Sequence, residues 1–430
     1  MTAHDLDRKT SEPSHRARLH LLGAAALGLS IPLLLAGRSM LAVAAVIALV
    51  GLLGAIGRKQ LVRGINNAFK SALGCAVWLT FSLWLISVVG SPDIAKSGEI
   101  WLRMVLLLIA GTALCCVLRE RSDLNDLVLR VLVAAALVCA ILGLVALHVL
   151  PETFAWLRGH GEEIAISDIA AQIMKSYGTV VACLMPVVLW AGWRIGGGWQ
   201  IAALVFQAAA IALLFSLQSR SGLVAAGLAL GVVGTWMAWR RFGLIGVTVV
   251  LALALAMIVA VAMDSQRNNQ IDAALGLPLW LLDAHRQSIW AFALEQVHAA
   301  PYFGIGPDMV STLPGSAGIV DGSTVEVLPS HPHNVLIEVL IETGAIGLAA
   351  MATALLFLFA GALRAMRRDG AAGAAVLGLS AAFWFASLIS YSFWSFWWQA
   401  TYILLLVPVV ATLTPGGLST GLGLRGQNKT

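Results

Sequence analysis

Long apolar runs alternate with short polar intervals along most of this chain. Runs of roughly 17 or more apolar residues are long enough to cross a bilayer as helices. They lie at 19–36, 39–57, 69–90, 101–118, 128–149, 177–193, 199–217, 221–239, 243–263, 345–366, 371–391 and 395–413. The pattern therefore predicts an all-α polytopic membrane protein with about twelve transmembrane helices.

The polar intervals divide the chain into five parts. We expect a cytoplasmic tail at 1–18, nine spans within 19–263, a long outer segment at 264–344, three spans within 345–413 and a cytoplasmic tail at 414–430. The outer segment contains a helical stretch at 284–298, in which Ile289, Ala293 and Val297 form an apolar stripe. This stretch should therefore pack against the membrane part.

Composition and charge exclude a soluble protein. The 430 residues are 59% hydrophobic and only 11% charged, which is too little polar surface for a soluble domain. The net charge of +5 does not indicate nucleic acid as a partner. Most of the 27 Lys and Arg residues fall in every second polar interval, and these intervals would all lie on the same side of the membrane. Basic residues favour the cytoplasmic side, so both termini should be cytoplasmic. The first run starts at Leu19 and reads as a retained span rather than a cleaved signal peptide.

One polar motif, Ser330-His-Pro-His-Asn334, closes the outer segment. Asn334 is a suitable N-cap for a helix over 335–343, and Gly344 should stop that helix. His333 then lies at the helix mouth, where a neutral imidazole could accept a proton; a purely structural histidine is the alternative. Asn334, Glu338 and Glu342 share one helix face and are expected to meet water or lipid headgroups.

Basic residues on the same outer side could bind an anion. Arg220 has Gln218 and Ser219 beside it, and Arg286 has Gln287 and Trp290 within one helical turn. The alternatives are a snorkelling arginine for Arg220 and a solvated charge for Arg286.

Lys175, at the start of another span, could contact phosphate or anchor the helix. Guanidinium groups bind phosphate oxygens in a bidentate way, so we expect a site for an anionic lipid headgroup.

A metal site is the competing interpretation. His331 and His333 are two residues apart and could chelate, but Pro332 intervenes and no matched carboxylate cluster accompanies them. The five cysteines all lie in apolar runs and indicate neither a disulfide nor a zinc site.

Five motifs together resemble the region shared by O-antigen ligases and O-antigen polymerases. They are Ser219-Arg-Ser-Gly222, Arg286-x-x-x-Trp290, Pro301-Tyr-Phe-Gly-Ile-Gly306, Pro332-His-Asn334 and Glu342-x-Gly344-x-x-Gly347. The resemblance implies the all-helical membrane glycosyltransferase fold called GT-C, with the long periplasmic segment between spans nine and ten.

The resemblance also implies a reaction. A glycan would pass from undecaprenyl pyrophosphate to a sugar of lipid A–core at the periplasmic face of the bacterial inner membrane. His333 would be the general base, and Arg220 and Arg286 would bind the donor pyrophosphate, with inversion at the anomeric carbon and without a metal or other cofactor. The residues expected to bind substrate are Lys175, Gln218, Ser219, Gln287, Trp290, His331 and Asn334.

Two other functions stay open. O-antigen polymerases share the motifs and the donor, although a single long outer segment favours the ligase. A lipid-linked glycan transporter is the alternative from another class, but transporters place polar or broken spans near the bilayer midplane. The polar candidates of this chain gather on one face instead, which favours chemistry at the membrane surface.

Overall fold

The computed structural model describes residues 15–159, 166–265, 275, 284–319, 327–328 and 330–413. Its helices are α1 (His15–Ser30), η1 (Pro32–Leu35), α2 (Arg38–Leu53), α3 (Arg58–Phe69), α4 (Ala72–Val89), α5 (Ile94–Glu120), α6 (Ser122–His148), α7 (Pro151–Leu157), α8 (Ile166–Ile195), α9 (Gly198–Ser216), α10 (Arg220–Ser265), α11 (Ala284–Gln296), η3 (Val297–Ala299), η4 (Val310–Thr312), α12 (Val335–Arg368), α13 (Gly370–Ile389) and α14 (Phe396–Ala411).

Eight of the described helices are long and apolar enough to cross a membrane: α4, α5, α6, α8, α9, α10, α12 and α13. The pair α2 and α3 would make nine if it counts as one span, although its two helices meet at 119°. Every predicted apolar run coincides with helical residues, but α14 has only 16 residues. The structure supports a multi-pass membrane protein, and both twelve spans and the GT-C fold stay predictions.

The helical bundle is built around α8. This helix packs against α6, α9, α10 and α13, and the side chains from Val180 to Met185 are fully buried. Trp398 and Phe383 stack in the same core at 4.7 Å between ring centroids. Such packing fixes the relative positions of α8, α13 and α14, whose ends come close to the candidate site.

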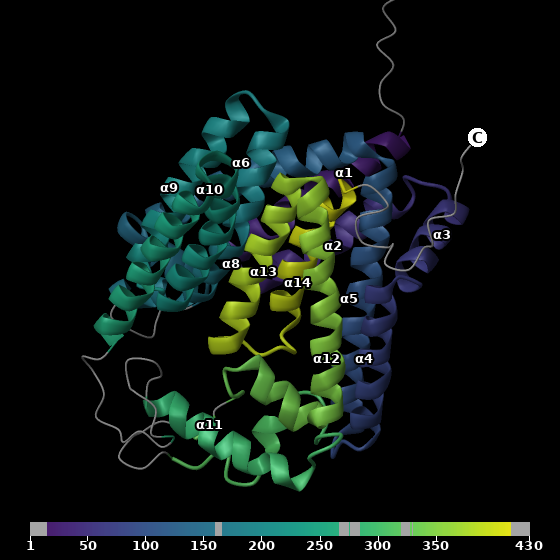
Figure 1. Cartoon of the computed structure of the whole chain (residues 1–430), viewed down its shortest axis with the longest axis vertical. Helices are drawn as coiled ribbons and strands as arrows, with labels where there is room; N and C mark the ends of the chain where they lie inside the picture. Colours follow the sequence, from purple (N-terminus) through teal and green to yellow (C-terminus); the bar gives the residue numbers. More distant parts are fainter. Residues whose placement is uncertain are drawn as a thin grey trace, which may run out of the picture.

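A separate layer caps one end of the bundle. In Figure 1, α11 and the loops that follow it lie at the lower end, opposite the end at which α1 begins. The predicted apolar stripe is confirmed here, because Ile289 and Ala293 are fully buried against Ile337 and Ile341 of α12. The layer is therefore packed onto the first part of α12.

The predicted break at Gly344 is confirmed and has an unexpected partner. Gly344 has a φ of +68°, inside α12. The N–H groups of Ala345 and Ile346 donate to the carbonyls of Pro301 and Tyr302, at 2.8 and 3.3 Å. The carbonyls of Ile341 and Glu342 accept from Ile305 and Gly306, at 3.1 and 2.9 Å. In an unbroken helix, these two N–H groups would donate to these two carbonyls. The 301–306 segment therefore supplies the hydrogen bonds that one helical turn would otherwise make.

Close backbone contact explains the glycines of this junction. A Cβ atom on Gly344 would lie 2.1 Å from the carbonyl carbon of Tyr302, and one on Gly304 would lie 2.3 Å from that of Glu342. Any side chain at either position would push the two segments apart. The glycines of two separate motifs thus serve one junction.

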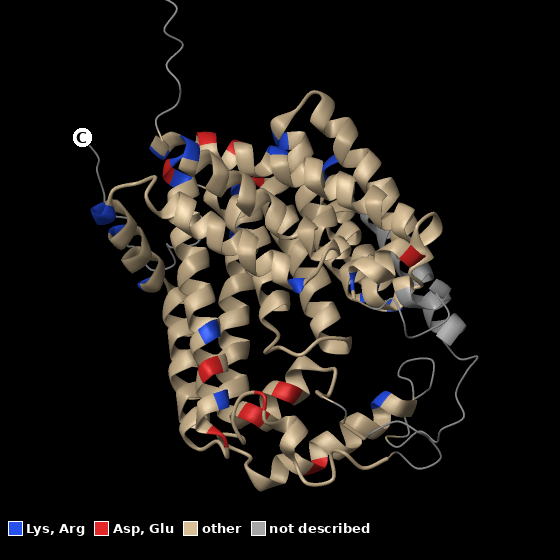
Figure 2. Cartoon of the chain, turned by 180° about the vertical axis from the view of Figure 1, so that it is seen from behind, with Lys and Arg blue, Asp and Glu red and all other residues tan. Residues whose placement is uncertain are grey.

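The charged residues differ between the two ends of the bundle. Figure 2 shows several Lys and Arg residues at the end where α1 begins and a group of acidic residues in the layer containing α11. The basic stretch between the predicted runs 39–57 and 69–90 forms the short helix α3 (Arg58–Phe69). This asymmetry agrees with the loop charges that led us to predict cytoplasmic termini.

Candidate functional site

His333 lies in the turn directly before α12 and has an unusual backbone. Its φ is +52°, in the left-handed region that few residues other than glycine adopt. Its Nδ1 lies 2.8 Å from the carbonyl oxygen of Ser390. Because a carbonyl can only accept a hydrogen bond, the ring proton belongs on Nδ1 and the lone pair on Nε2. This tautomer can act as a general base through Nε2.

His331 packs against His333, with 4.1 Å between ring centroids. Its Nδ1 is 2.8 Å from the hydroxyl of Ser330, and its Nε2 is 3.3 Å from the same Ser390 carbonyl. Burial, and to a lesser extent the neighbouring His333, lowers the pKa of His331 to about 4. His331 is therefore neutral near pH 7 and supports the ring of His333.

The predicted alternative of a metal chelate meets a geometric obstacle. Nε2 of His331 and Nδ1 of His333 both point to the Ser390 carbonyl, so these two nitrogens serve as donors. Among the described residues, no group of three or more His, Cys, Asp and Glu side chains is placed to hold a metal ion. The part of the chain described here offers no obvious chelate.

Asn334 starts α12 as predicted. Its Oδ1 accepts from the N–H groups of Leu336 and Ile337, at 2.9 and 3.2 Å, and satisfies two of the otherwise unpaired donors of the first turn. Asn334 is also buried. Its side chain therefore fixes where the helix begins and, with it, where His333 lies.

Trp290 joins α11 to the histidine loop. Its indole Nε1 donates to the carbonyl of Pro332 at 2.9 Å. Arg286 precedes Trp290 by four residues and lies on the same face of α11. Gln287 is fully buried, and its Oε1 accepts from the backbone of Leu275 at 3.2 Å. The face of α11 that bears Arg286 is thus directed to the loop with His333.

Arg220 is the first residue of α10, and its side chain is exposed. Ser219 is buried and accepts from the N–H of Gly222 at 3.3 Å, while Gln218 has a φ of +47°. The N-terminus of a helix carries partial positive charge, so the guanidinium adds to a field that attracts anions.

Lys175 is exposed on α8. The meeting of Arg220, Arg286 and His333 around one chamber stays a prediction.

The expectation for Glu338 and Glu342 is wrong. Both are fully buried rather than turned to water or headgroups. Glu338 accepts from the Ser392 hydroxyl at 2.6 Å and from the N–H of Phe393 at 2.7 Å. The shared helix face was predicted correctly, but it meets the loop between α13 and α14.

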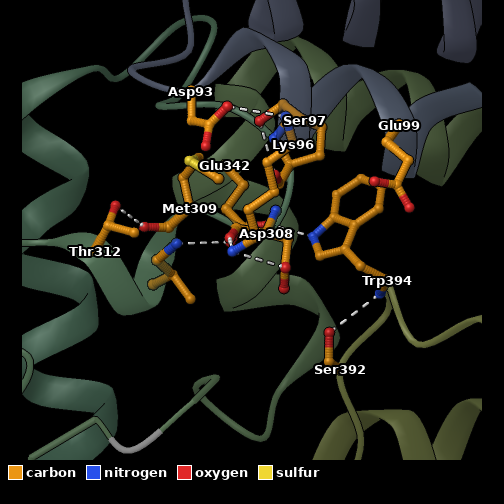
Figure 3. Close-up of polar contacts among 12 residues, drawn as sticks. Asp93, Lys96, Ser97, Glu99, Asp308, Met309, Thr312, Glu342, Ser392 and Trp394 are labelled. Carbon is orange, nitrogen blue, oxygen red and sulfur yellow. Dashed lines mark hydrogen bonds and ion pairs between the residues drawn. The ribbon is translucent and has the colours of Figure 1, made fainter.

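Glu342 collects donors from two further segments. It accepts from the N–H groups of Asp308 and Val310, at 2.8 and 2.9 Å, and from the indole of Trp394 (Figure 3). Lys96 then pairs with Asp308 at 3.0 Å and ties α5 to the same loop. Glu342 therefore fastens the outer layer to the bundle beneath His333.

Sequence reasoning missed the residue that orients the histidines and two residues that bind the glutamates of α12. Ser390 acts through its backbone carbonyl, for which no side-chain motif exists. Ser392 and Trp394 lie between the predicted runs 371–391 and 395–413, where we expected only a short connection. The available signal was the polar group Ser390-Tyr-Ser392 at the end of the predicted run 371–391.

Comparison with known proteins agrees with these motifs. Residues 202–352 match the family model described as O-antigen ligase. The protein named "Putative polysaccharide ligase RP358" of Rickettsia prowazekii (strain Madrid E) is 27% identical over 137 residues, which cover 31% of this chain and 33% of that protein. "Putative polysaccharide ligase RT0347" of Rickettsia typhi (strain ATCC VR-144 / Wilmington) is 26% identical over 135 residues, again 31% and 33%.

These alignments span about a third of the length of the curated relatives. The family segment includes Arg220, Arg286 and His333 but not Lys175. The resemblance inferred from the five motifs is confirmed: over residues 202–352 this chain matches the O-antigen ligase family.

Proposed function

We propose that this protein is an O-antigen ligase that transfers O-antigen polysaccharide from undecaprenyl pyrophosphate to a sugar hydroxyl of lipid A–core. The observation that carries the proposal is the hydrogen bond from His333 Nδ1 to the Ser390 carbonyl. It assigns the lone pair to Nε2 of a histidine inside the segment that matches the ligase family. Transfer to a hydroxyl requires such a base.

In the proposed reaction, Nε2 of His333 removes the proton of the acceptor hydroxyl. The oxygen attacks the anomeric carbon, the bond from that carbon to the pyrophosphate oxygen breaks, and the configuration inverts. The Ser390 carbonyl then stabilises the imidazolium through Nδ1–H. Arg220 and Arg286 neutralise the charge on the departing undecaprenyl pyrophosphate, which makes a divalent cation unnecessary.

The remaining predicted residues would position the substrates. Trp290 and His331 would hold the base loop beside the sugar, and Asn334 would fix the start of α12. Gln218, Ser219 and Lys175 would line the approach of the donor, and Gln287 would support Arg286 from the next position on α11. The lipid tails of both substrates would stay among the membrane lipids.

We further propose that the protein lies in the bacterial inner membrane with both termini in the cytoplasm and the layer of α11 in the periplasm. The support is the charge of the loops and the position of α11 opposite the start of α1 (Figure 1). This orientation brings His333 to the compartment in which the proposed acceptor lies.

The test is complementation of a strain that lacks its O-antigen ligase, read on a lipopolysaccharide ladder gel. Restored long chains on lipid A–core would support the ligase. Chains that lengthen only in a strain lacking the polymerase would assign the polymerase reaction instead. Restoration of neither, with normal protein in the membrane, would contradict both transfer reactions.

Metal independence has its own test. Transfer by the purified protein should be unchanged by EDTA, because the two arginines supply the positive charge. Strong inhibition that added divalent metal reverses would instead favour a site that includes His331 and His333.

A further inference from the structure

A basic cavity lies outside the segment that matches the ligase family. Its volume is about 600 Å³, and it lies between η1, α2, α7, α8 and α14. The polar residues that line it are Arg38, Ser39, Arg158, Ser176 and Tyr177. None of the described lining residues is acidic. The cavity therefore carries net positive charge.

The two arginines reach the cavity from different elements. Arg158, at the end of α7, donates from Nη1 to the Leu35 carbonyl at 3.4 Å. Gly37 has a φ of +142°, and a Cβ there would lie 2.8 Å from that Nη1. Burial and then the neighbouring Arg38 lower the pKa of Arg158. An anion between the two guanidinium groups would relieve this repulsion.

Arg38 is held in place by an aromatic ring and lies at a helix end. Its guanidinium carbon is 4.7 Å from the ring centroid of Trp397, a cation–π distance. It is the first residue of α2, whose N-cap Gly37 has no side chain to satisfy the first N–H groups. The helix terminus and Arg38 attract negative charge to the same place.

Tyr177 forms part of the cavity wall and is 2% exposed. Its hydroxyl oxygen has almost no accessible surface. The two arginines are therefore the groups that can contact a charged ligand.

The rim of the cavity is apolar. Leu157 lines the opening and is 69% exposed, and Trp156 beside it is 71% exposed. Exposed tryptophan and leucine next to a basic pocket suit a ligand whose charged group enters the cavity while its apolar part stays in lipid.

We propose that this cavity binds the phosphate group of a membrane lipid, held by Arg38 and Arg158. It is joined to the candidate site through one residue. Tyr391 follows Ser390, donates to the Thr179 hydroxyl at 3.0 Å, and packs against Trp397 at 5.1 Å between ring centroids. A phosphate in the cavity thus lies across Tyr391 from the carbonyl that orients His333.

The test is a binding titration of the full-length protein in detergent, with neither donor nor acceptor present, so that it does not depend on the proposed transfer. The probes are dihexanoyl phosphatidic acid, dihexanoyl phosphatidylcholine and inorganic phosphate. Wild-type protein should bind phosphatidic acid roughly tenfold or more tightly than phosphatidylcholine, whose choline offsets the phosphate charge. The same preference is expected over inorganic phosphate, which has no acyl chain to contact the apolar side chains beside the cavity.

The variants are Arg38→Gln and Arg158→Gln. Each should weaken the binding of phosphatidic acid roughly tenfold or more. Arg194→Gln is the matched control, because it also removes a guanidinium from a tryptophan face, 5.8 Å above Trp190. It should leave binding unchanged.

Two results would overturn the proposal. Equal affinity for inorganic phosphate and phosphatidic acid would refute a lipid ligand and assign a site for free phosphate. Unchanged binding in Arg38→Gln would refute the site itself, even if Arg158→Gln fails to fold.

Discussion

The histidine loop and the glutamates of α12 follow each other in the chain, yet their surroundings are opposite. Glu338 and Glu342 are fully buried, and their oxygens accept hydrogen bonds from loops that come from elsewhere in the fold. His331 and His333 are only partly buried, and the tautomer of His333 keeps a lone pair on Nε2. The two glutamates thus stabilise the fold, whereas His333 is held in the tautomer that the proposed base requires.

This contrast predicts that His333 matters for rate and little for stability. His333→Ala should lower transfer by roughly 10²–10⁴-fold, the usual contribution of a general base. His333→Asn should do the same while it tolerates the left-handed backbone at this position. Initial rates of glycan transfer in membranes would be measured, with the exposed His298→Ala as control. Normal transfer by the asparagine variant would end the assignment of the base.

Glu342 should show the reverse pattern. Glu342→Ala leaves the N–H groups of Asp308 and Val310 and the indole of Trp394 without their acceptor. The expected loss of stability is on the order of 3 kcal/mol. The melting temperature in detergent would be compared with that of Glu99→Ala, whose carboxylate is exposed. An unchanged melting temperature would show that Glu342 does not fasten the outer layer.

Arg286→Lys tests whether the shape of the cation matters as well as its charge. Lysine keeps the charge but loses the planar fork, so transition-state stabilisation should fall by about 2–4 kcal/mol. Transfer rates would be compared with those of Arg240→Lys. Arg240 lies over the ring of Trp236, just before the kink of α10 at Gly243 and far along the helix from Arg220. A rate near that of the wild type would argue against bidentate contact with the pyrophosphate.

His331 should give the smallest effect, visible only in acid. Because its pKa falls from 6.5 to about 4 on folding, the folded state favours the neutral ring. Its contribution to stability is complete above pH 6.5 and is lost as the pH falls from 6.5 towards 4. The change between pH 7 and pH 5.5 should be about 1 kcal/mol.

Melting temperatures at those two pH values would be measured. The drop on acidification should be smaller in His331→Gln than in the wild type. An equal drop in both proteins would assign the acid sensitivity to other groups.

Local signals in the sequence were sufficient to locate the long apolar helices and to predict the start of α12 and the break within it. The apolar runs, the N-cap Asn334 and the break at Gly344 were all predicted from residues within one or two turns. The five motifs also located the family segment. What they could not give is which distant segment meets each motif, because the burial of Glu342 depends on donors at 308, 310 and 394.

The basic cavity escaped prediction for the same reason. Arg38, Arg158, Tyr177 and Trp397 come from four separate stretches, and each alone resembles an ordinary residue near the end of a span. Only the packing of α8 against its neighbours brings them together. The pairing of the 301–306 segment with α12 was likewise hidden, although both of its glycine motifs were recognised.

The junction at Gly344 has a mechanical consequence. A helix that only bends at a glycine could change its angle there. In α12, backbone hydrogen bonds hold both halves of the helix to the 301–306 segment. The corner is therefore stiff, and the half that starts beside His333 cannot tilt without pulling that segment along. In the proposed reaction, the acceptor hydroxyl would therefore meet His333 at one fixed distance from the membrane-crossing half of the helix, whatever the length of the glycan on the donor.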